Sequence, residues 1–263
     1  MRRVAFVYNP ASNSGRSAGP FERLKRQTAG WPETAYRTSR RSGDIRGLAA
    51  SLAESFDVVA ACGGDGTVHE VAGALAGTAC ALGVVPVGNG NDTAKSLGVP
   101  LDVEKSLALL REGRIHSVDL GSCNGRHFIN TLGFGFDGEV AGMVREGGGS
   151  GRLAYVAAAL RTCLMHRRMA CGIDGEPVPR ALLPLLLPLF IAGRQGWLPV
   201  VHSRPVRECR LRFDAPVSAH MDGEAFGEGE RDFLVRIHPG GLRAVCGPDA
   251  ALARSGRERA SDL

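Results

Sequence analysis

The residues with the clearest chemical potential form one glycine-rich turn. Gly63, Gly64 and Gly66 allow the backbone to turn sharply and to approach a ligand closely. A carboxylate, Asp65, stands between two of these glycines, and Thr67 follows them. A strand, such a turn and a helix start together present several backbone N–H groups at the positive end of a helix dipole, which is a phosphate-binding arrangement. A carboxylate at an anion site needs a role in metal binding or proton transfer. The alternative is a tight turn whose glycines serve geometry alone.

The residues around this turn predict the elements that hold it. The run Val58–Cys62 is short and begins with β-branched residues, which is typical of a buried parallel strand. Thr67 stands where a helix would start, and Glu70 follows at the spacing of a capping box. We therefore expect a helix over Val68–Leu75.

Two further loops follow the same plan of strand, polar turn and helix. The run Arg3–Tyr8 predicts a strand that leads into Asn9–Arg16, whose small polar residues are by themselves a weak signal for phosphate binding. Ala81–Val87 predicts another buried strand, which ends in Gly88–Lys95, a second glycine turn that carries the carboxylate of Asp92 at a helix start. Ligands of parallel sheets bind at the carboxyl ends of the strands, where both glycine turns fall.

The order of the elements predicts the fold of the first half. Short apolar runs alternate with longer amphipathic patterns. The strands are expected at 3–8, 34–38, 58–62 and 81–87, and the helices at 21–29, 42–55, 68–75 and 103–111. This alternation predicts an α/β N-terminal domain with a parallel sheet and helices on both faces, over residues 1–115.

The pattern changes after Gly113 to short strand-like runs with turns between them. The runs are 114–120, 126–132, 184–192, 208–213, 215–220 and 232–238, with one helix expected at about 153–165. They predict a mostly antiparallel β-sandwich or barrel over residues 116–246. Residues 247–263 are polar and charged, and we expect a tail that frays there.

Composition limits the surroundings and partners of the chain. Its 263 residues carry a net charge of +5, which mildly favours anionic partners such as nucleotides or anionic lipid. The seven cysteines show no CxxC pair, which indicates reduced thiols in a cytoplasmic protein, several of them small core residues. No signal peptide is evident. The longest apolar segment, Ala181–Ala192, is interrupted by two prolines and falls short of the roughly 20 residues that span a bilayer.

The ordered set of motifs resembles the diacylglycerol-kinase catalytic-domain family, the soluble lipid kinases that include diacylglycerol, sphingosine and ceramide kinases. The turns Gly63–Thr67 and Gly88–Asp92 carry the resemblance in the first half. Asp119–Gly121, Phe128–Asp137 and Met221–Glu224 carry it in the second half. The resemblance implies an active site in the cleft between an α/β domain that binds ATP and a β-sandwich domain that carries the acceptor lipid.

The resemblance also implies roles for single residues in an ATP- and Mg²⁺-dependent phosphorylation of a hydroxyl group on a lipid or lipid-like acceptor. For Mg²⁺, the natural carboxylates are Asp65, Asp92 and Asp119, one from each of three successive turns. The base for the acceptor hydroxyl falls on Glu224 or on Asp222 beside it, with Asp65 as a competitor. The residues implied to contact ATP are Asn9, Pro10, Ser14, Thr38, Gly64, Asp65, Gly66, Thr67, Val68, His69, Glu70, Gly88 and Asn89.

A second Asp-Gly-Glu triplet, at 174–176, must be weighed against the one at 222–224. Asp-Gly between Ile173 and Pro177 is a hairpin-turn signal, and its place in the chain matches no catalytic position. We therefore assign this triplet a structural role.

The chain departs from the family pattern in two places. Asn89 stands where the second glycine turn usually has a threonine. The stretch 192–208 is shortened and lacks the aspartates with which family members hold a structural Mg²⁺. These departures motivate the alternative of a degenerate member that binds nucleotide or lipid without turnover. A kinase of a soluble acceptor is a third reading.

Arginines in the second half bear on where the protein acts. They would draw a cytoplasmic protein to the inner face of an anionic membrane as a peripheral enzyme, or they form a solvated face. They are Arg161, Arg167, Arg168, Arg204, Arg207, Arg210 and Arg212. Nucleic acid is not expected as a partner. The sequence does not define the oligomeric state, for which a homodimer is one option.

Overall fold

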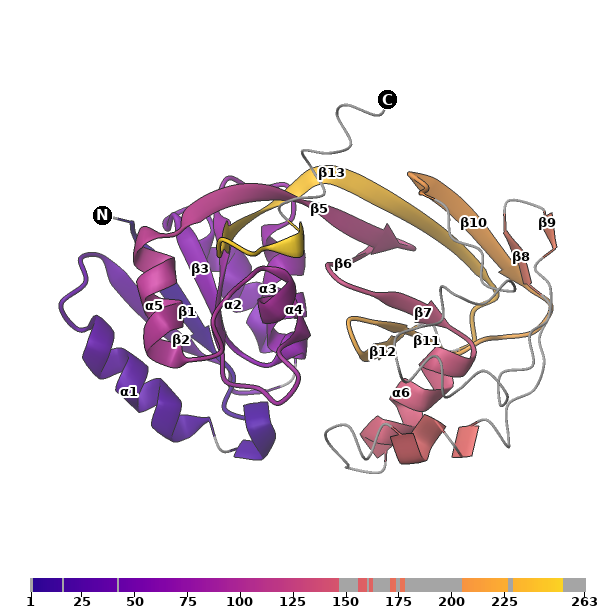
Figure 1. Cartoon of the computed structure of the whole chain (residues 1–263), viewed down its shortest axis with the longest axis horizontal. Coiled ribbons are helices and arrows are strands. Elements are labelled where there is room, and N and C mark those ends of the chain that lie inside the picture. The colour runs from indigo at the N-terminus through magenta and orange to yellow at the C-terminus, as the bar shows by residue number, and fades with distance from the viewer. Residues whose placement is uncertain are drawn as a thin grey trace. The chain divides into compact units, whose positions relative to one another are not determined.

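The structure is a computed structural model. It describes residues 2–15, 17–41, 43–146, 156–159, 161–162, 171–173, 176–177, 205–226 and 229–252. The chain divides into two compact units, the first made of residues 1–121, 126–130 and 238–263 and the second of residues 122–125 and 131–237. Two long strands, β5 (Arg114–Cys123) and β13 (Asp232–Cys246), contribute residues to both units (Figure 1).

The first unit is built on a parallel sheet. Strand β1 lies between β2 and β3, β4 follows β3, and the C-terminal part of β13 pairs in parallel with β4. The strands are β1 (Val4–Tyr8), β2 (Thr34–Thr38), β3 (Val58–Gly63), β4 (Ala81–Pro86) and the short β6 (Arg126–Phe128), which pairs with β5. The helices are the 3₁₀ turn η1 (Ser12–Gly15), α1 (Ala18–Thr28), α2 (Asp44–Leu52), α3 (Asp65–Leu75), α4 (Asp92–Ser96) and α5 (Val103–Glu112).

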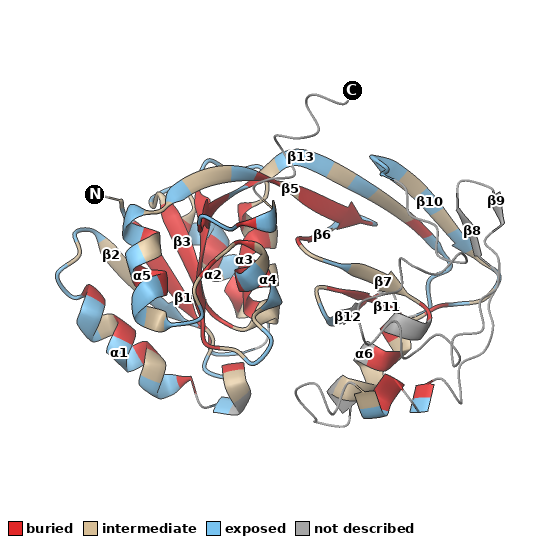
Figure 2. Cartoon of the chain, viewed as in Figure 1, coloured by how far each residue is buried: buried red, intermediate tan, exposed pale blue. Residues whose placement is uncertain are grey.

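Helices cover both faces of this sheet, which explains the continuous apolar runs in its strands. Every residue of β1, β3 and β4 is buried, as Figure 2 shows for β1 and β3. On one face α2 and α3 bring Ile45 and Val71 into the core, and on the other α1 and α5 bring Phe21 and Leu110. A parallel sheet with helices on both faces requires strands that are apolar on both sides, and β1, β3 and β4 meet this requirement. The predicted α/β class is therefore confirmed.

The start of α3 corrects a prediction. The helix begins at Asp65 rather than at Val68, its N-cap is Gly64, and no side chain caps it. The capping box expected from Thr67 and Glu70 is therefore wrong. The physical reason is that the extended backbone of Gly64 completes the turn directly, so Thr67 already lies within the first helical turn.

The second unit contains antiparallel strand pairs. Strand β10 (Glu208–Phe213) pairs with the N-terminal part of β13 and with β8 (Cys171–Ile173), which pairs in turn with β9 (Glu176–Pro177). A separate sheet joins β12 (Glu224–Phe226), β11 (Ala219–Met221) and β7 (Leu132–Phe134) in that order. The antiparallel pairing agrees with the prediction, as do the paired strands on either side of the expected hairpin at 174–175.

Other elements of the second half differ from expectation. Helix α6 (Phe136–Glu146) was not predicted. The run predicted at 215–220 is a strand only from Ala219, and the run at 126–132 is split between β6 and β7. The strand expected to end at His238 continues to Cys246. Of the helix expected at 153–165, residues 156–159 and 161–162 are helical, and the strand expected at 184–192 lies outside the described residues.

The segment directly after β13 packs against the rest of the first unit instead of fraying from Gly247 onward. The Gly247 N–H donates to the Leu97 carbonyl at 2.9 Å, and Ala250 is buried. A Cβ on Gly98 would lie 2.8 Å from the Ala250 nitrogen, so the two backbones are in close contact. The expected tail is therefore wrong for residues 247–252, and residues 253–263 lie outside the described part of the chain.

Candidate functional site

The turn between β3 and α3 leaves a helix N-terminus without a side-chain cap. The first intrahelical hydrogen bond runs from the Val68 N–H to the Gly64 carbonyl at 3.1 Å. The N–H groups of the preceding helical residues have no intrahelical acceptor, and no side chain caps this end of α3. These N–H groups and the helix dipole together favour an anion at this position.

The Thr67 hydroxyl is used inside the protein. It accepts a hydrogen bond from the Asn9 side-chain N–H at 3.1 Å and lies 3.4 Å from the Ser12 hydroxyl. A Cβ on Gly63 would lie only 2.2 Å from the Thr67 Oγ1, so glycine is required at Gly63 for this packing. The family resemblance implies that Thr67 contacts ATP; in the structure Thr67 is buried in the first turn of α3 and its hydroxyl accepts from Asn9 of the first loop.

The two glycine turns touch each other. A Cβ on Gly88 would lie 2.3 Å from the Gly64 Cα, which only glycine at Gly88 avoids. The Asp65 Oδ1 accepts a hydrogen bond from the backbone N–H of Thr93, in α4, at 3.0 Å. The turns after β3 and β4 therefore form one continuous surface, and the Asp65 carboxylate ties them together.

The structure brings together two of the three carboxylates predicted for a metal. A Cβ on Gly90 would lie 2.8 Å from the Asp65 Oδ2 and 3.6 Å from the Asp92 Oδ2, so both oxygens face the same glycine. The Asp92 Oδ1 also pairs with Lys95 at 2.8 Å.

Asp119 is used differently. Its Oδ1 accepts the Gly240 N–H at 3.0 Å and thereby joins β5 to β13. Within the described ranges, no group of three or more His, Cys, Asp or Glu side chains could hold a metal ion. Among the described residues, the structure therefore does not gather Asp65, Asp92 and Asp119 into one group.

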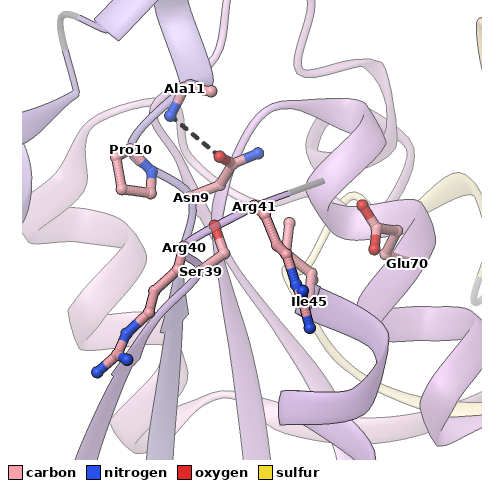
Figure 3. Close-up of a pocket in the computed structure, with 8 residues that line it drawn as sticks. All are labelled: Asn9, Pro10, Ala11, Ser39, Arg40, Arg41, Ile45 and Glu70. Carbon is pink, nitrogen blue, oxygen red and sulfur yellow. Dashed lines mark hydrogen bonds between the residues drawn. The ribbon is translucent and has the colours of Figure 1, made fainter. Parts of the chain in front are cut away.

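A pocket of about 280 Å³ opens beside this surface, at the carboxyl ends of β1 and β2 (Figure 3). It is lined by Asn9, Pro10, Ala11, Ser39, Arg40, Arg41, Ile45 and Glu70. These residues come from the loops after two neighbouring parallel strands, from the start of α2 and from α3. This is the edge at which ligands bind to parallel sheets.

The pocket contains part of the predicted nucleotide set. Asn9, Pro10 and Glu70 line it, and Thr38 ends β2 directly before the lining residue Ser39. Of the others, Ser14 lies in η1, His69 lies on α3 but does not line the pocket, and Asn89 is exposed in the second turn.

Three pocket-lining residues were not predicted from the sequence as ligand-binding residues: Ser39, Arg40 and Arg41. The available signal was a pair of adjacent cations one residue after the predicted strand 34–38, at the edge of the sheet where ligands bind.

Asp44 orders the arginine loop. Its Oδ2 accepts the backbone N–H groups of Arg40 and Arg41 at 3.1 Å each, and its Oδ1 accepts the Arg41 Nε–H at 3.0 Å. The Arg41 side chain, followed by the Arg40 N–H, holds the pKa of Asp44 below its usual value. The start of α2 therefore fixes the backbone from which two positive side chains border the pocket.

The Asp-Gly-Glu triplet of the second unit forms the hairpin between β11 and β12. Asp222 and Gly223 take φ angles of 49° and 87° in a two-residue turn. The Asp222 Oδ1 accepts the Thr131 N–H at 3.0 Å, and the Asp222 N–H donates to the Thr131 carbonyl at 2.9 Å. Asp222 therefore anchors the hairpin, whereas Glu224, the first residue of β12, is exposed.

Ion pairs between arginines and acidic residues cross the ladder between β10 and β13. Arg212 pairs with Asp232 at 3.0 Å, and Arg236 pairs with Glu208 at 2.7 Å across the β10–β13 ladder. Arg167, Arg168 and Arg204 of the predicted basic set lie outside the described residues. In the described part of the chain, no helix has both the length and the apolar character to cross a membrane.

Comparison with known proteins places this geometry in a family. Residues 3–123 match the diacylglycerol kinase catalytic domain, a segment that contains both glycine turns and the pocket. Residues 3–123 belong to the diacylglycerol kinase catalytic domain family. Diacylglycerol kinases of Staphylococcus saprophyticus and Staphylococcus aureus are each 33% identical over 138 residues, or 51% of this chain. The match covers 45% and 44% of those relatives, so it spans less than half of their length.

Solved structures show the same fold over nearly the whole chain. A diacylglycerol kinase from Bacillus anthracis matches with a TM-score of 0.74, at 18% identity, over 94% of this chain and 98% of the other. An NAD kinase from Archaeoglobus fulgidus in complex with ATP matches with a TM-score of 0.53 and 14% identity, over 99% of both chains. At these identities the likeness to both structures concerns the fold.

Proposed function

We propose that this protein is an ATP-dependent kinase that transfers a phosphoryl group to a hydroxyl of a lipid or lipid-like acceptor. The observation that carries the proposal is the uncapped N-terminus of α3, which meets the Asp65 carboxylate at the edge of a parallel sheet beside a pocket. Its presence in the segment that matches a kinase family supports this reading.

The first unit supplies a site for the nucleotide. The pocket of about 280 Å³ is slightly smaller than the roughly 300–1,000 Å³ found for sites of drug-sized ligands, and it suits the nucleoside part of ATP. The phosphates would lie at the N–H groups of the first turn of α3, with Gly88 and Asn89 of the second turn beside them. Arg40 adds positive charge at the pocket, which favours an anionic ligand, whereas the charge of Arg41 is paired with Asp44.

The carboxylates near Gly90 suit a magnesium–nucleotide complex. Asp65 and Asp92 offer two oxygens that face the same point, and Mg²⁺ at phosphate sites commonly takes one or two carboxylates together with phosphate oxygens and water. When bound, Mg²⁺–ATP supplies the phosphoryl group and part of the charge neutralisation that its transfer needs. The role of Asp65 is to orient this complex while its other oxygen keeps α4 in place.

The second unit supplies the candidate base. Of the two acids in the triplet, Asp222 is committed to Thr131 by two hydrogen bonds, and Glu224 is exposed at the start of β12. Glu224 would accept the proton of the acceptor hydroxyl. Asp65 stays the competing candidate for that role.

Phosphoryl transfer tests this function directly. Purified protein with Mg²⁺, radiolabelled ATP and vesicles that contain diacylglycerol, ceramide or sphingosine should yield a labelled lipid. Asp65→Asn should abolish the product, because the asparagine removes the charge that orients the metal. The matched control is Asp102→Asn at the N-cap of α5, where asparagine caps as well as aspartate and activity should persist. Full activity of Asp65→Asn would rule out the mechanism.

Two other outcomes would redirect the assignment. ATP binding without turnover on any acceptor would identify a degenerate member of the family, as the substitution at Asn89 and the shortened stretch 192–208 allow. Turnover of soluble alcohols but not of lipids would identify a kinase of a soluble acceptor.

A further inference from the structure

We propose that Thr67 is a positioning residue, whose hydroxyl holds the first loop of the pocket against α3 and does not contact the nucleotide. The proposal rests on the ATP-binding function proposed above. Its basis is the hydrogen bond from the Asn9 side chain to Thr67, which joins residues 58 positions apart in the chain.

The hydroxyl of Thr67 is buried and occupied. The residue is 3% exposed, its Oγ1 accepts the Asn9 Nδ2–H at 3.1 Å, and the Ser12 Oγ lies 3.4 Å away. A hydroxyl has one proton and two lone pairs, so these two partners use most of its capacity. When the Thr67 hydroxyl donates its proton to Ser12, it has no proton left to donate to a phosphate oxygen.

Side chains determine the shape of the loop that Thr67 holds. The Asn9 Oδ1 accepts the Ala11 N–H at 3.0 Å. The buried Ser17 hydroxyl lies 3.4 Å from the Asn9 and Pro10 carbonyl oxygens and 3.1 Å from the Tyr8 hydroxyl. Ser17 thus holds the loop from its far end, and Thr67 links the loop to the helix that carries the phosphate-binding N–H groups.

This link couples the two halves of the nucleotide site. Asn9, Pro10 and Ala11 line the pocket, whereas Thr67 belongs to the first turn of α3. Without the hydroxyl, the partly buried Asn9 amide loses its acceptor, and leaving such a group unsatisfied is unfavourable. The loop would then move, and the pocket would fit the nucleoside less well.

Calorimetric titration of the whole protein with Mg²⁺–ATP tests the proposal. Thr67→Val keeps the shape of the side chain and removes the hydroxyl, and we expect it to weaken binding about tenfold. Thr67→Ser keeps the hydroxyl and should bind like the wild type. The matched control is Thr28→Val on α1, where an equally buried hydroxyl donates to the Leu24 carbonyl at 2.9 Å, and ATP affinity should not change.

A double substitution separates positioning from direct contact. If Thr67 acts through Asn9, Thr67→Val should cause no further loss of affinity in an Asn9→Ala background. A further tenfold loss in that background, or wild-type affinity of the single Thr67→Val variant, would overturn the role of Thr67. Failure of the wild-type protein to bind ATP would instead overturn the proposed function, and this proposal with it.

A crystal structure of the wild-type protein with a non-hydrolysable ATP analogue gives a second test that does not depend on how the variants fold. We expect the Thr67 Oγ1 to remain hydrogen-bonded to Asn9. A hydrogen bond from this oxygen to a phosphate would refute the positioning role.

Discussion

At the scale of single residues, His127 is held in surroundings that oppose its protonation. It lies on β6, and its ring meets that of His238, on β13, in an edge-to-face contact at 5.7 Å. Its Nδ1 is buried and has no hydrogen-bond partner among the described residues. Burial is the largest cause that lowers the pKa of His127, followed by the charges of His238, of Arg46 on α2 and of His69 on α3.

The sign of the resulting pH dependence follows from this lowered pKa. The unfolded chain takes up a proton near the ordinary pKa of 6.5, and the folded protein does so only at lower pH. Folding stability should therefore be complete above about pH 6.5 and fall as the pH drops through the lowered pKa. His127→Gln should flatten the decrease in melting temperature between about pH 7.5 and 5, and His116→Gln, on β5, should not. A wild-type slope in the His127→Gln variant would show that other groups cause the acid sensitivity.

At the scale of elements, the β11–β12 hairpin assigns different roles to two neighbouring acids. Asp222 holds the turn and Glu224 faces solvent, so substitutions at the two positions should separate stability from chemistry. Glu224→Gln should lower kcat by roughly 10²–10⁴, the usual contribution of a general base, with an unchanged melting temperature and ATP affinity. Asp222→Asn should keep most activity, because asparagine tolerates a positive φ and still accepts from the Thr131 N–H. A larger loss of kcat in Asp222→Asn than in Glu224→Gln would assign the base to Asp222.

The sequence predicted those helices and strands whose apolar residues and flanking turn residues are adjacent in the chain. Strand β2 was expected at its observed bounds, and β3 differs by one residue, because both are short β-rich runs bounded by turn residues. Helix α6 escaped prediction because Gly138 and Gly142 interrupt its helical pattern. The predicted strand ended at His238 because Pro239 and the two glycines after it are typical turn residues, whereas β13 continues to Cys246.

The candidate site was predictable in part for the same reason. The glycine turns and Asn9 are visible in the sequence, since each follows an apolar run directly. The use of Thr67 by Asn9, the convergence of Asp65 and Asp92 on Gly90, and the strand-packing role of Asp119 all depend on contacts between distant residues. No local pattern encodes such contacts.

At the scale of the whole molecule, the first unit is assembled from separate parts of the chain. The C-terminal part of β13 pairs with β4, where Arg243 lies opposite Ala81 and Ala244 opposite Leu82. Leu242 and Ala244 join the core on one face of the sheet, and Val245 joins the core on the other. The segment that matches the family ends at residue 123, more than a hundred residues before this strand. The family match therefore covers less than the folding unit.

We expect a fragment of residues 1–123 to lack cooperative folding. Without β13, β4 becomes an exposed edge strand with unpaired backbone groups, and apolar core surface on both faces of the sheet loses its cover. Calorimetry should show one or more cooperative transitions for the full chain and none for the fragment, which should aggregate. Co-expression of a segment that contains residues 232–252 should increase the soluble yield of the fragment, and the same segment with Ala244→Asp should not, because the charge would enter the core beside β4. A cooperative transition and ATP binding by the fragment alone would show that β13 is dispensable for the nucleotide unit.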